Sequence, residues 1–358
     1  MVTKYCVAYD PATAEQTLGL PLQTVYNPTS DVTKYPGRSS LKDTYELILN
    51  DLNDALNLTT PGATNSNYFT KDVVKALLAR VQLNMKDWTN AAKNAQEVIN
   101  TNTYTLASSE NDLEGLFVQD ASNELLFVVA GSVNDAPTST GGAFINDSEN
   151  GDGSTPDPTF IPTKTLVDLY IYNDDKNNDM RYPIFFETKE VTEQGAGTAE
   201  LELLWKFAGN PSYQVTAGRL NYTNAGKIRI SEMYLTLAEA AANMGEAQMA
   251  VASQYLNELR ASRIKGYTDE TYNSTNLMAT IKQEWTREFV GEGFRMINMK
   301  RWGDDVNFGE PQVAAMVYRN ENLASLNKRI TDNRAIWPIP KKEMDVNPQM
   351  KGQQNPGY

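Results

Sequence analysis

The chain has 358 residues, enough for one large domain or two small ones, and its 41% hydrophobic and 22% charged residues are ordinary for a folded protein. Its net charge of −13 argues against nucleic acid or an anionic membrane surface as the partner. The sequence has no histidine, which excludes imidazole bases and metal ligands, and its single cysteine, Cys6, excludes an intrachain disulfide and a cysteine zinc cluster.

The first forty residues are rich in Pro, Thr, Asn and Tyr without regular periodicity, which predicts a loop or an arm packed on the body of the protein. Regular structure is expected from Ser39 or Ser40, either of which can cap a helix that has Asp43 in its first turn. Apolar residues then recur at helical spacing as far as Leu56, and residues 59–62 end the helix.

Residues 71–100 have the most regular pattern, with apolar residues at helical spacing on both sides of a break at residues 86–88. Residues 229–263 repeat this arrangement, and their break at residues 244–246 falls at the corresponding place. The pattern resembles a tetratricopeptide repeat, so we expect a helical-repeat scaffold interrupted by an insertion. The alternative is a pair of unrelated helical hairpins.

The region between the two hairpins begins with an apolar run, residues 123–130, that predicts a strand or an extended segment. Residues 131–157 are polar and rich in glycine, which is typical of a long surface loop that is either functional or disordered. Residues 173–179 resemble the first half of a calcium-binding loop, but the glycine and glutamate of its second half are missing. A solvated turn ending in an Asp179–Arg181 pair is the favoured interpretation, ahead of a calcium site.

Residues 199–225 carry several aromatic side chains among Gly, Asn and Ser, without helical periodicity. Exposed rings on loops can stack on the apolar faces of sugars, whereas buried rings would be the internal packing of an irregular insertion. The sequence leaves both interpretations open. Aromatic rings would provide stacking, and Asn and Asp side chains would bind hydroxyl groups. The candidate ligand-binding residues are Phe144, Asn146, Asp147, Trp205, Tyr213 and Tyr222.

Residues 283–303 mix charged and large apolar side chains. In a helix, Leu277, Ile281, Trp285 and Phe289 form one apolar stripe, with charged side chains beside it. Buried charges persist only when they are paired and hydrogen-bonded, so the pattern predicts an internal ion-pair network that fixes helix packing. The alternative is a pair of catalytic carboxylates, for which the obvious candidates are Glu288 and Glu292.

Four motifs resemble the SusD/RagB-like outer-membrane nutrient-binding proteins. They are RISEMYLTLAEAAANMG at residues 229–245, LNELRASR at 256–263, the charged segment 284–303, and the ending WPIP followed by NPQMKGQQNPGY. The motifs YDPATAEQTLGLPL and PGRSSLKDTYELILNDLNDAL in the N-terminal part are similar to the family as well.

The tail contains several prolines and is expected to pack against another part of the protein.

The resemblance implies a noncatalytic, lipid-anchored protein on the cell surface that binds glycans for polysaccharide utilisation. Family members pass oligosaccharides to a SusC-like TonB-dependent transporter in the outer membrane, and they need no cofactor or metal for this. They also begin with a lipoprotein signal, a lipidated cysteine and further helices that this chain is expected to lack. Membrane attachment is therefore expected only through an N-terminal lipid outside this sequence.

We therefore expect a mostly α-helical, tetratricopeptide-like single domain over residues 1–358. The expected parts are a scaffold at about residues 39–125 and 226–303, a loop-rich insertion at about 131–225, and an extended tail at about 304–358. Two alternatives to glycan binding remain: a peptide-binding uptake lipoprotein of the same fold, and a glycoside hydrolase that uses two carboxylates.

Overall fold

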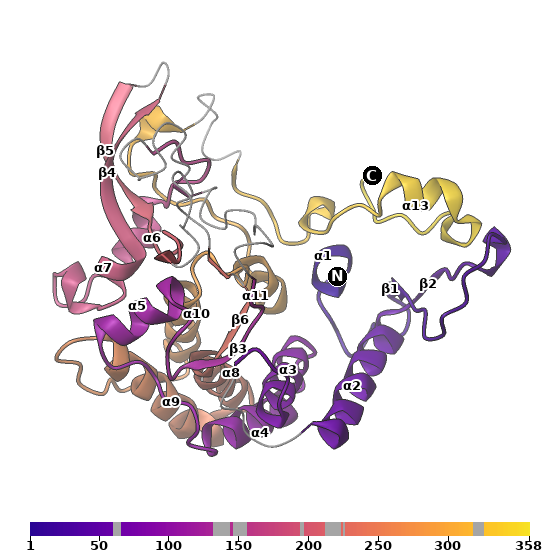
Figure 1. Cartoon of the computed structure of the whole chain (residues 1–358), viewed down its shortest axis with the longest axis horizontal. Helices are drawn as coiled ribbons and strands as arrows, with labels where there is room; N and C mark the ends of the chain where they lie inside the picture. The colour runs from indigo at the N-terminus through magenta and orange to yellow at the C-terminus, as the bar shows by residue number, and fades with distance from the viewer. Residues whose placement is uncertain are drawn as a thin grey trace.

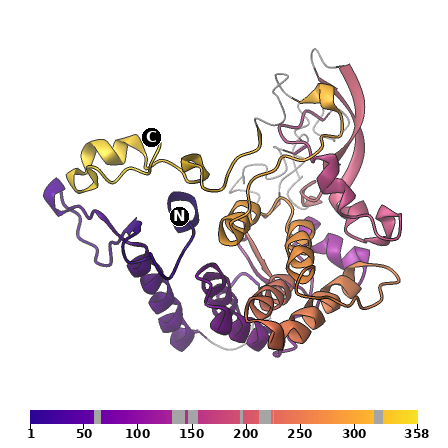
Figure 2. The same ribbon diagram turned by 180° about the vertical axis from the view of Figure 1, so that it is seen from behind.

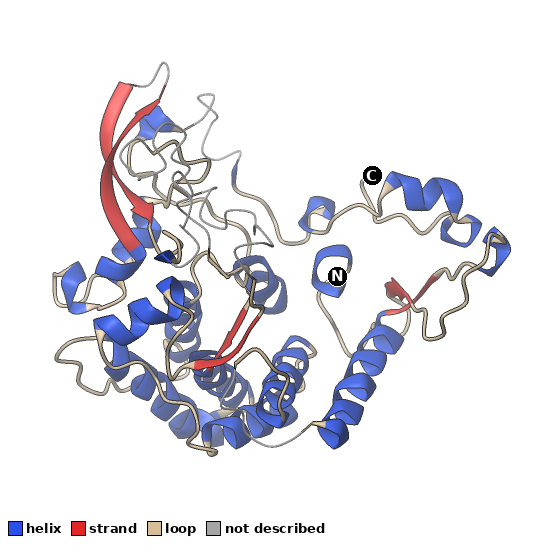
Figure 3. Cartoon of the chain, viewed as in Figure 1, coloured by secondary structure: helices blue, strands red, loops and turns tan. Residues whose placement is uncertain are grey.

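The computed structural model describes residues 1–59, 66–131, 144–145, 156–193, 197–211, 223–224, 226–317 and 326–358. Helices dominate these ranges, accompanied by three antiparallel two-stranded sheets (Figure 3). None of the helices in these ranges combines the length and the apolar character that crossing a membrane requires. The predicted fold class, mostly α-helical, is confirmed.

The longer helices are α2 (Leu41–Leu58), α3 (Lys71–Asn84), α4 (Trp88–Ile99), α5 (Glu110–Val118), α8 (Ile230–Asn243), α9 (Met249–Arg263), α10 (Leu277–Glu288) and α11 (Arg295–Trp302). The shorter ones are α1 (Val2–Tyr5), α6 (Lys164–Asp168), α7 (Tyr182–Phe185) and α13 (Lys341–Val346). The strands pair as β1 (Leu18–Pro21) with β2 (Arg38–Ser40), β3 (Leu125–Val128) with β6 (Lys227–Arg229), and β4 (Phe186–Glu193) with β5 (Gly197–Leu204).

The two predicted helical hairpins are present as α3–α4 and α8–α9, and they pack on each other through α4 and α8. The turns correspond as expected: Lys86 and Gly245, one in each break, both have a positive φ, of 62° and 93°. Ala79 and Ala91 are completely buried, which lets α3 and α4 approach closely. Seen from behind, α2 leads from the N-terminal arm into this helical body (Figure 2).

The helix starts follow the residues that cap them. The Ser40 side chain accepts a hydrogen bond from the Asp43 amide, so α2 begins one residue later, within the predicted window. Thr70 and Asp87 cap α3 and α4 in the same way. The core of the scaffold is formed by the facing sides of α3, α4, α8, α9 and α10.

The chain leaves the scaffold after β3 and returns to it through β6. These two strands are antiparallel partners, with Leu125 opposite Arg229 and Val128 opposite Lys227. The extended segment predicted at residues 123–130 is therefore a strand. The pairing therefore holds the two ends of the intervening region together.

The structure corrects the prediction that residues 199–204 are irregular. They belong to β5, which pairs with β4 over eight residues in continuous register, from Phe186 opposite Leu204 to Glu193 opposite Gly197. The sequence TAELELL alternates apolar and acidic residues, which is the period of a strand with one buried face. In Figure 1 this hairpin projects from the body as a long ribbon.

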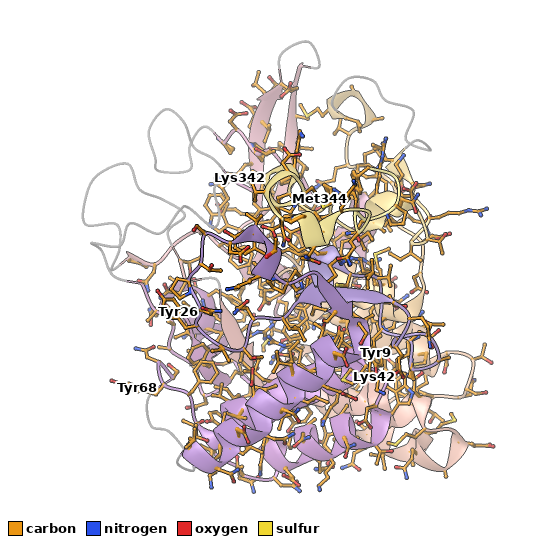
Figure 4. The ribbon with its side chains drawn as sticks, turned by 90° about the vertical axis from the view of Figure 1, so that its right-hand side faces the viewer. Tyr9, Tyr26, Lys42, Tyr68, Lys342 and Met344 are labelled. Carbon is orange, nitrogen blue, oxygen red and sulfur yellow. The ribbon has the colours of Figure 1, made fainter. Side chains whose placement is uncertain are left out.

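The two ends of the chain pack against each other, which confirms that the tail requires a partner. The Trp337 amide donates to the Lys4 carbonyl at 2.8 Å, and the Asn355 side-chain amide donates to the Tyr5 carbonyl at 2.9 Å. Figure 4 shows α13, marked by Lys342 and Met344, beside the N-terminal segments and above α2. The arm and the tail thus form one body at the side of the scaffold (Figure 1).

Arg38 joins the arm to the tail. Its buried guanidinium donates to the carbonyls of Gly19 at 2.8 Å, Leu18 at 3.0 Å and Gln353 at 3.0 Å, and to the Asn355 side chain at 2.8 Å. All four acceptors are uncharged, so this guanidinium binds the two segments together through hydrogen bonds.

We expect Arg38→Ala to lower the free energy of unfolding by roughly 2–3 kcal/mol, because it leaves several buried carbonyl groups without a donor. The arm and the tail should loosen first, so limited proteolysis should cut the tail of the variant before the scaffold. Thermal unfolding and timed proteolysis followed by mass spectrometry measure the two effects. Cleavage at the wild-type rate would show that Arg38 does not hold these segments.

Candidate functional site

The charged segment at the end of α10 is the first candidate, and it is completely buried. Glu288 lies among three arginines from three other parts of the chain: Arg181 at 2.9 Å, Arg229 at 2.7 Å and Arg263 at 2.9 Å. None of these four side chains has any exposed surface. Glu124, directly before β3, accepts from both Arg229 and Arg263 and extends the cluster across the scaffold.

Two further carboxylates complete the network. Glu284 is bound by Arg181 and, at 2.6 Å, by Arg287. Glu292, in the turn after α10, is 2.9 Å from Arg229 and 2.6 Å from the amino group of Lys206. These contacts connect α10 to the insertion through Lys206 and to β6 through Arg229. The predicted internal ion-pair network is confirmed.

The protonation of this cluster does not suit catalysis. Burial by itself raises the pKa of Glu288, but the opposing effects of Arg263, Arg229 and Arg181 are larger and hold its pKa well below the usual range. The pKa of Glu292 is lowered for the same kind of reason, by Arg229 and Lys206. A glycoside hydrolase needs a general acid that keeps its proton near neutral pH, so Glu288 and Glu292 do not form such a pair.

The turn at residues 173–179 ends in the predicted Asp179–Arg181 pair, with 2.6 Å between the two side chains. The turn is solvated as predicted, with Asn173, Asp174, Asp175 and Asn177 exposed, but the pair itself is buried and Arg181 belongs to the ion-pair network. No arrangement of three acidic or cysteine side chains able to hold a metal ion occurs in the part of the chain that the structure describes.

Two of the six candidate ligand-binding residues lie within the described ranges. Phe144 is half-buried; its ring stacks on Phe207, with 6.0 Å between centroids, and lies 6.4 Å from the ring of Phe160. Trp205 is also half-buried, directly after β5, with the amino group of Lys189 at 4.8 Å from its ring. No ring contact between Phe144 and Trp205 occurs among the described aromatic pairs. The other four, Asn146, Asp147, Tyr213 and Tyr222, lie outside the described residues.

A cleft with a volume of about 740 Å³ lies next to this aromatic group. Phe160, which touches Phe144, is 60% exposed and lines the cleft. The other wall comes from a segment far along the chain, which includes Phe308 and Met316. The volume of the cleft falls within the range typical of small-molecule sites. The cleft is lined mainly by apolar residues with a few polar groups, which is also typical of such sites.

The β4–β5 hairpin supports this cleft from below. Leu201 and Leu203, on its apolar face, pack with Ile161 and Met316 from the two walls. Gln312 fastens the walls to the hairpin: its side-chain amide donates to the carbonyls of Pro162 at 2.8 Å and Glu202 at 2.9 Å. Both walls of the cleft therefore contact the β4–β5 hairpin.

Sequence reasoning missed Phe160, Phe308 and the cleft itself. Phe160 lies between Pro158 and Pro162, and an aromatic residue between prolines is a signal of a rigid, exposed segment that could have been used. Nothing local marks Phe308 as its neighbour across the cleft, because the two segments are remote in sequence.

Comparison with known proteins agrees with this architecture. The model of the SusD family matches residues 176–358. No curated protein sequence matches the chain. A SusD superfamily protein from Bacteroides thetaiotaomicron is 26% identical, with a TM-score of 0.78 over 99% of this chain and 74% of that chain.

Two structures from Bacteroides vulgatus are similar in fold. A SusD superfamily protein is 24% identical, with a TM-score of 0.75 over 99% of this chain and 74% of that chain. A SusD-like carbohydrate binding protein is 18% identical, with a TM-score of 0.75 over 98% of this chain and 73% of that chain. Because the family model matches more than half of its length, this chain belongs to the SusD family.

Proposed function

We propose that this chain binds oligosaccharides in the cleft beside Phe144 and Phe160 and does not cleave them. The observation that supports this most strongly is the exposed ring of Phe160 on the wall of the cleft, beside the ring of Phe144, which itself stacks on Phe207. A sugar ring presents an apolar face that stacks on such a surface at little entropic cost. The carbohydrate binding attributed to a relative of the same fold supports the same ligand class.

The polar half of the site is proposed to come from the loops on either side of this aromatic group. Asn146 and Asp147 lie two and three positions after Phe144 in the chain, and their side chains are suited to binding sugar hydroxyls. Trp205, Tyr213 and Tyr222 remain proposed stacking residues. In this proposal residues 131–225 form the ligand-binding insertion, and the helices at residues 39–125 and 226–303 form the scaffold.

The cellular role we propose is the one that the family implies. The protein would be held at the cell surface of the outer membrane by an N-terminal lipid and would pass its ligand to a SusC-like TonB-dependent transporter. Affinity purification of the protein from the outer membrane of its own cells tests this. Recovery of a TonB-dependent transporter in equimolar amount is expected, and recovery of the protein alone from intact membranes would contradict the partnership.

The noncatalytic part of the proposal has its own test. The only carboxylate pair suggested by the sequence is buried in ion pairs, which supports binding without turnover. Incubation with a panel of oligosaccharides is expected to release no new reducing ends. If the wild type released reducing ends and a folded Glu288→Gln variant did not, the glycoside hydrolase alternative would be supported instead.

Alanine at Phe160 is expected to weaken oligosaccharide binding about tenfold, since it removes one stacking face. Trp205→Ala tests the second described candidate in the same way. The matched control is Tyr26→Ala: Tyr26 is 92% exposed but lies on the N-terminal arm (Figure 4), so this variant should bind like the wild type. Calorimetric affinities unchanged by Phe160→Ala and by Trp205→Ala would refute the assignment of the site.

A further inference from the structure

The outer edge of β5 has backbone groups that point away from β4. In an antiparallel pair, successive residues of a strand direct their backbone groups alternately to the partner strand and to the opposite edge. The Glu202 amide and carbonyl are both bound by the side chain of Gln312, at 2.9 Å each, so Glu202 faces the outer edge. By the same alternation, Glu200 and Thr198 face that edge too.

The side chain of Gln312 shows what this edge accepts. Its amide supplies one acceptor and one donor to the two backbone groups of Glu202, as a peptide unit of a neighbouring strand would. These hydrogen bonds along the outer edge end at Glu202. In the described chain no hydrogen bond reaches the outward amides and carbonyls of Glu200 and Thr198, and both residues are exposed. Unpaired edges of this kind are templates for a further strand.

The charges around this edge are acidic. Glu190 and Glu200 lie directly opposite each other in the register, a like-charge arrangement that destabilises a sheet. Neither takes part in an ion pair within the described chain, and Glu193 at the tip of β4 does not either; the carboxylates of Glu187 and Glu202 are paired with lysines. A partner carrying positive charge would relieve this repulsion.

The apolar side of the same strand borders the cleft. Leu201 lies between Glu200 and Glu202 and faces the opposite side of the sheet, where it packs with Met316 and lines the cleft. An added strand would place alternate side chains on the two faces of the hairpin. Apolar side chains of the added strand would lie on the face of Leu201, and its basic side chains on the face that carries Glu190, Glu200 and Glu202.

We propose that the outer edge of β5, at Thr198 and Glu200, binds an extended peptide that alternates basic and apolar residues, by adding it to the hairpin as a third strand. This is an activity beyond oligosaccharide binding. The affinity comes from main-chain hydrogen bonds and the preference from the alternating faces. Gln312 fixes the register, because it already occupies the position next to Glu202.

The test uses the whole chain and a short capped peptide that alternates lysine with valine and phenylalanine. Thr198→Pro removes an amide that points to the outer edge, where proline is tolerated, and should weaken peptide binding about tenfold. Thr192→Pro is the matched control. Thr192 is the register partner of Thr198, and each variant loses the same hydroxyl contact of 2.8 Å, but Thr192 faces the other edge. It should bind like the wild type.

Two further measurements separate strand addition from nonspecific attraction to an acidic protein. A peptide of the same sequence, N-methylated at every residue, has no backbone donor along either edge and should not bind. Hydrogen exchange of the Glu200 amide should slow when the unmodified peptide is present. Absence of peptide binding, equal binding of the N-methylated peptide, or equal loss in both proline variants would overturn the proposal. Thr198→Pro and Thr192→Pro should both keep the oligosaccharide affinity of the wild type. Peptide binding and oligosaccharide binding are therefore tested separately, and one proposal can fail without the other.

Discussion

Glu288→Gln is expected to lower the free energy of unfolding by about 3–5 kcal/mol, the loss typical of removing one partner from a buried ion pair. The neutral amide keeps the shape of the side chain but leaves Arg181, Arg229 and Arg263 around a site that no longer carries charge. Because these arginines come from three separate parts of the chain, the effect should appear as loss of the whole fold. Urea unfolding followed by circular dichroism measures it.

The matched control for this variant is Asp345→Asn. Asp345 pairs with Lys341 at 2.9 Å on the surface of α13, where the two side chains are 56% and 87% exposed. Exposed pairs contribute little, so this variant should stay within about 0.5 kcal/mol of the wild type. If Glu288→Gln were as mild as Asp345→Asn, the buried network would not be what holds the helices and the insertion together.

Acid is expected to destabilise the protein through the same network. Burial by itself raises the pKa of Glu284, but Arg181, Arg287 and Arg260 outweigh it and lower the pKa from its ordinary value of 4.5 to about 2. A carboxyl whose pKa is lower in the folded state stabilises the fold above its unfolded pKa. That stabilisation is lost as the pH falls from about 4.5 toward about 2, and for Glu284 it amounts to about 3 kcal/mol.

Unfolding free energies of the wild type and of Glu284→Gln between pH 7 and pH 3 test this. The variant should be less stable at neutral pH, and its stability should fall less steeply in acid, because the glutamine cannot take up a proton. Parallel curves for the two proteins would show that Glu284 does not contribute to the acid sensitivity.

Residues that act locally made much of the scaffold predictable. Ser40 and Asp43 predict the start of α2, and the equal spacing of the breaks near Lys86 and Gly245 predicts the two hairpins. The mixture of Glu284 and Glu288 with an apolar stripe predicts buried ion pairs. Their partners could not be named, because Arg181 and Arg229 come from elements whose approach depends on the whole fold.

The candidate site was far less predictable. Gln312 binds the carbonyl of Pro162 across 150 positions of sequence, and no local pattern reports such a contact. The alternation in β5 is that of a strand, but residues 199–225 as a whole lack helical periodicity and are rich in Gly, Asn and Ser, which favours an irregular insertion. Phe144 was selected as an isolated aromatic residue in a polar loop, and its contact with Phe160 is what places it beside a cleft.

Isothermal titration calorimetry with oligosaccharides selected on a glycan array tests the central claim most directly, using the wild type, Phe160→Ala and Tyr26→Ala, with reducing ends assayed in the same samples. Saturable binding that weakens about tenfold in Phe160→Ala but not in Tyr26→Ala, without release of reducing ends, is the predicted result. Equal affinity of all three proteins, or release of reducing ends by the wild type, would contradict it.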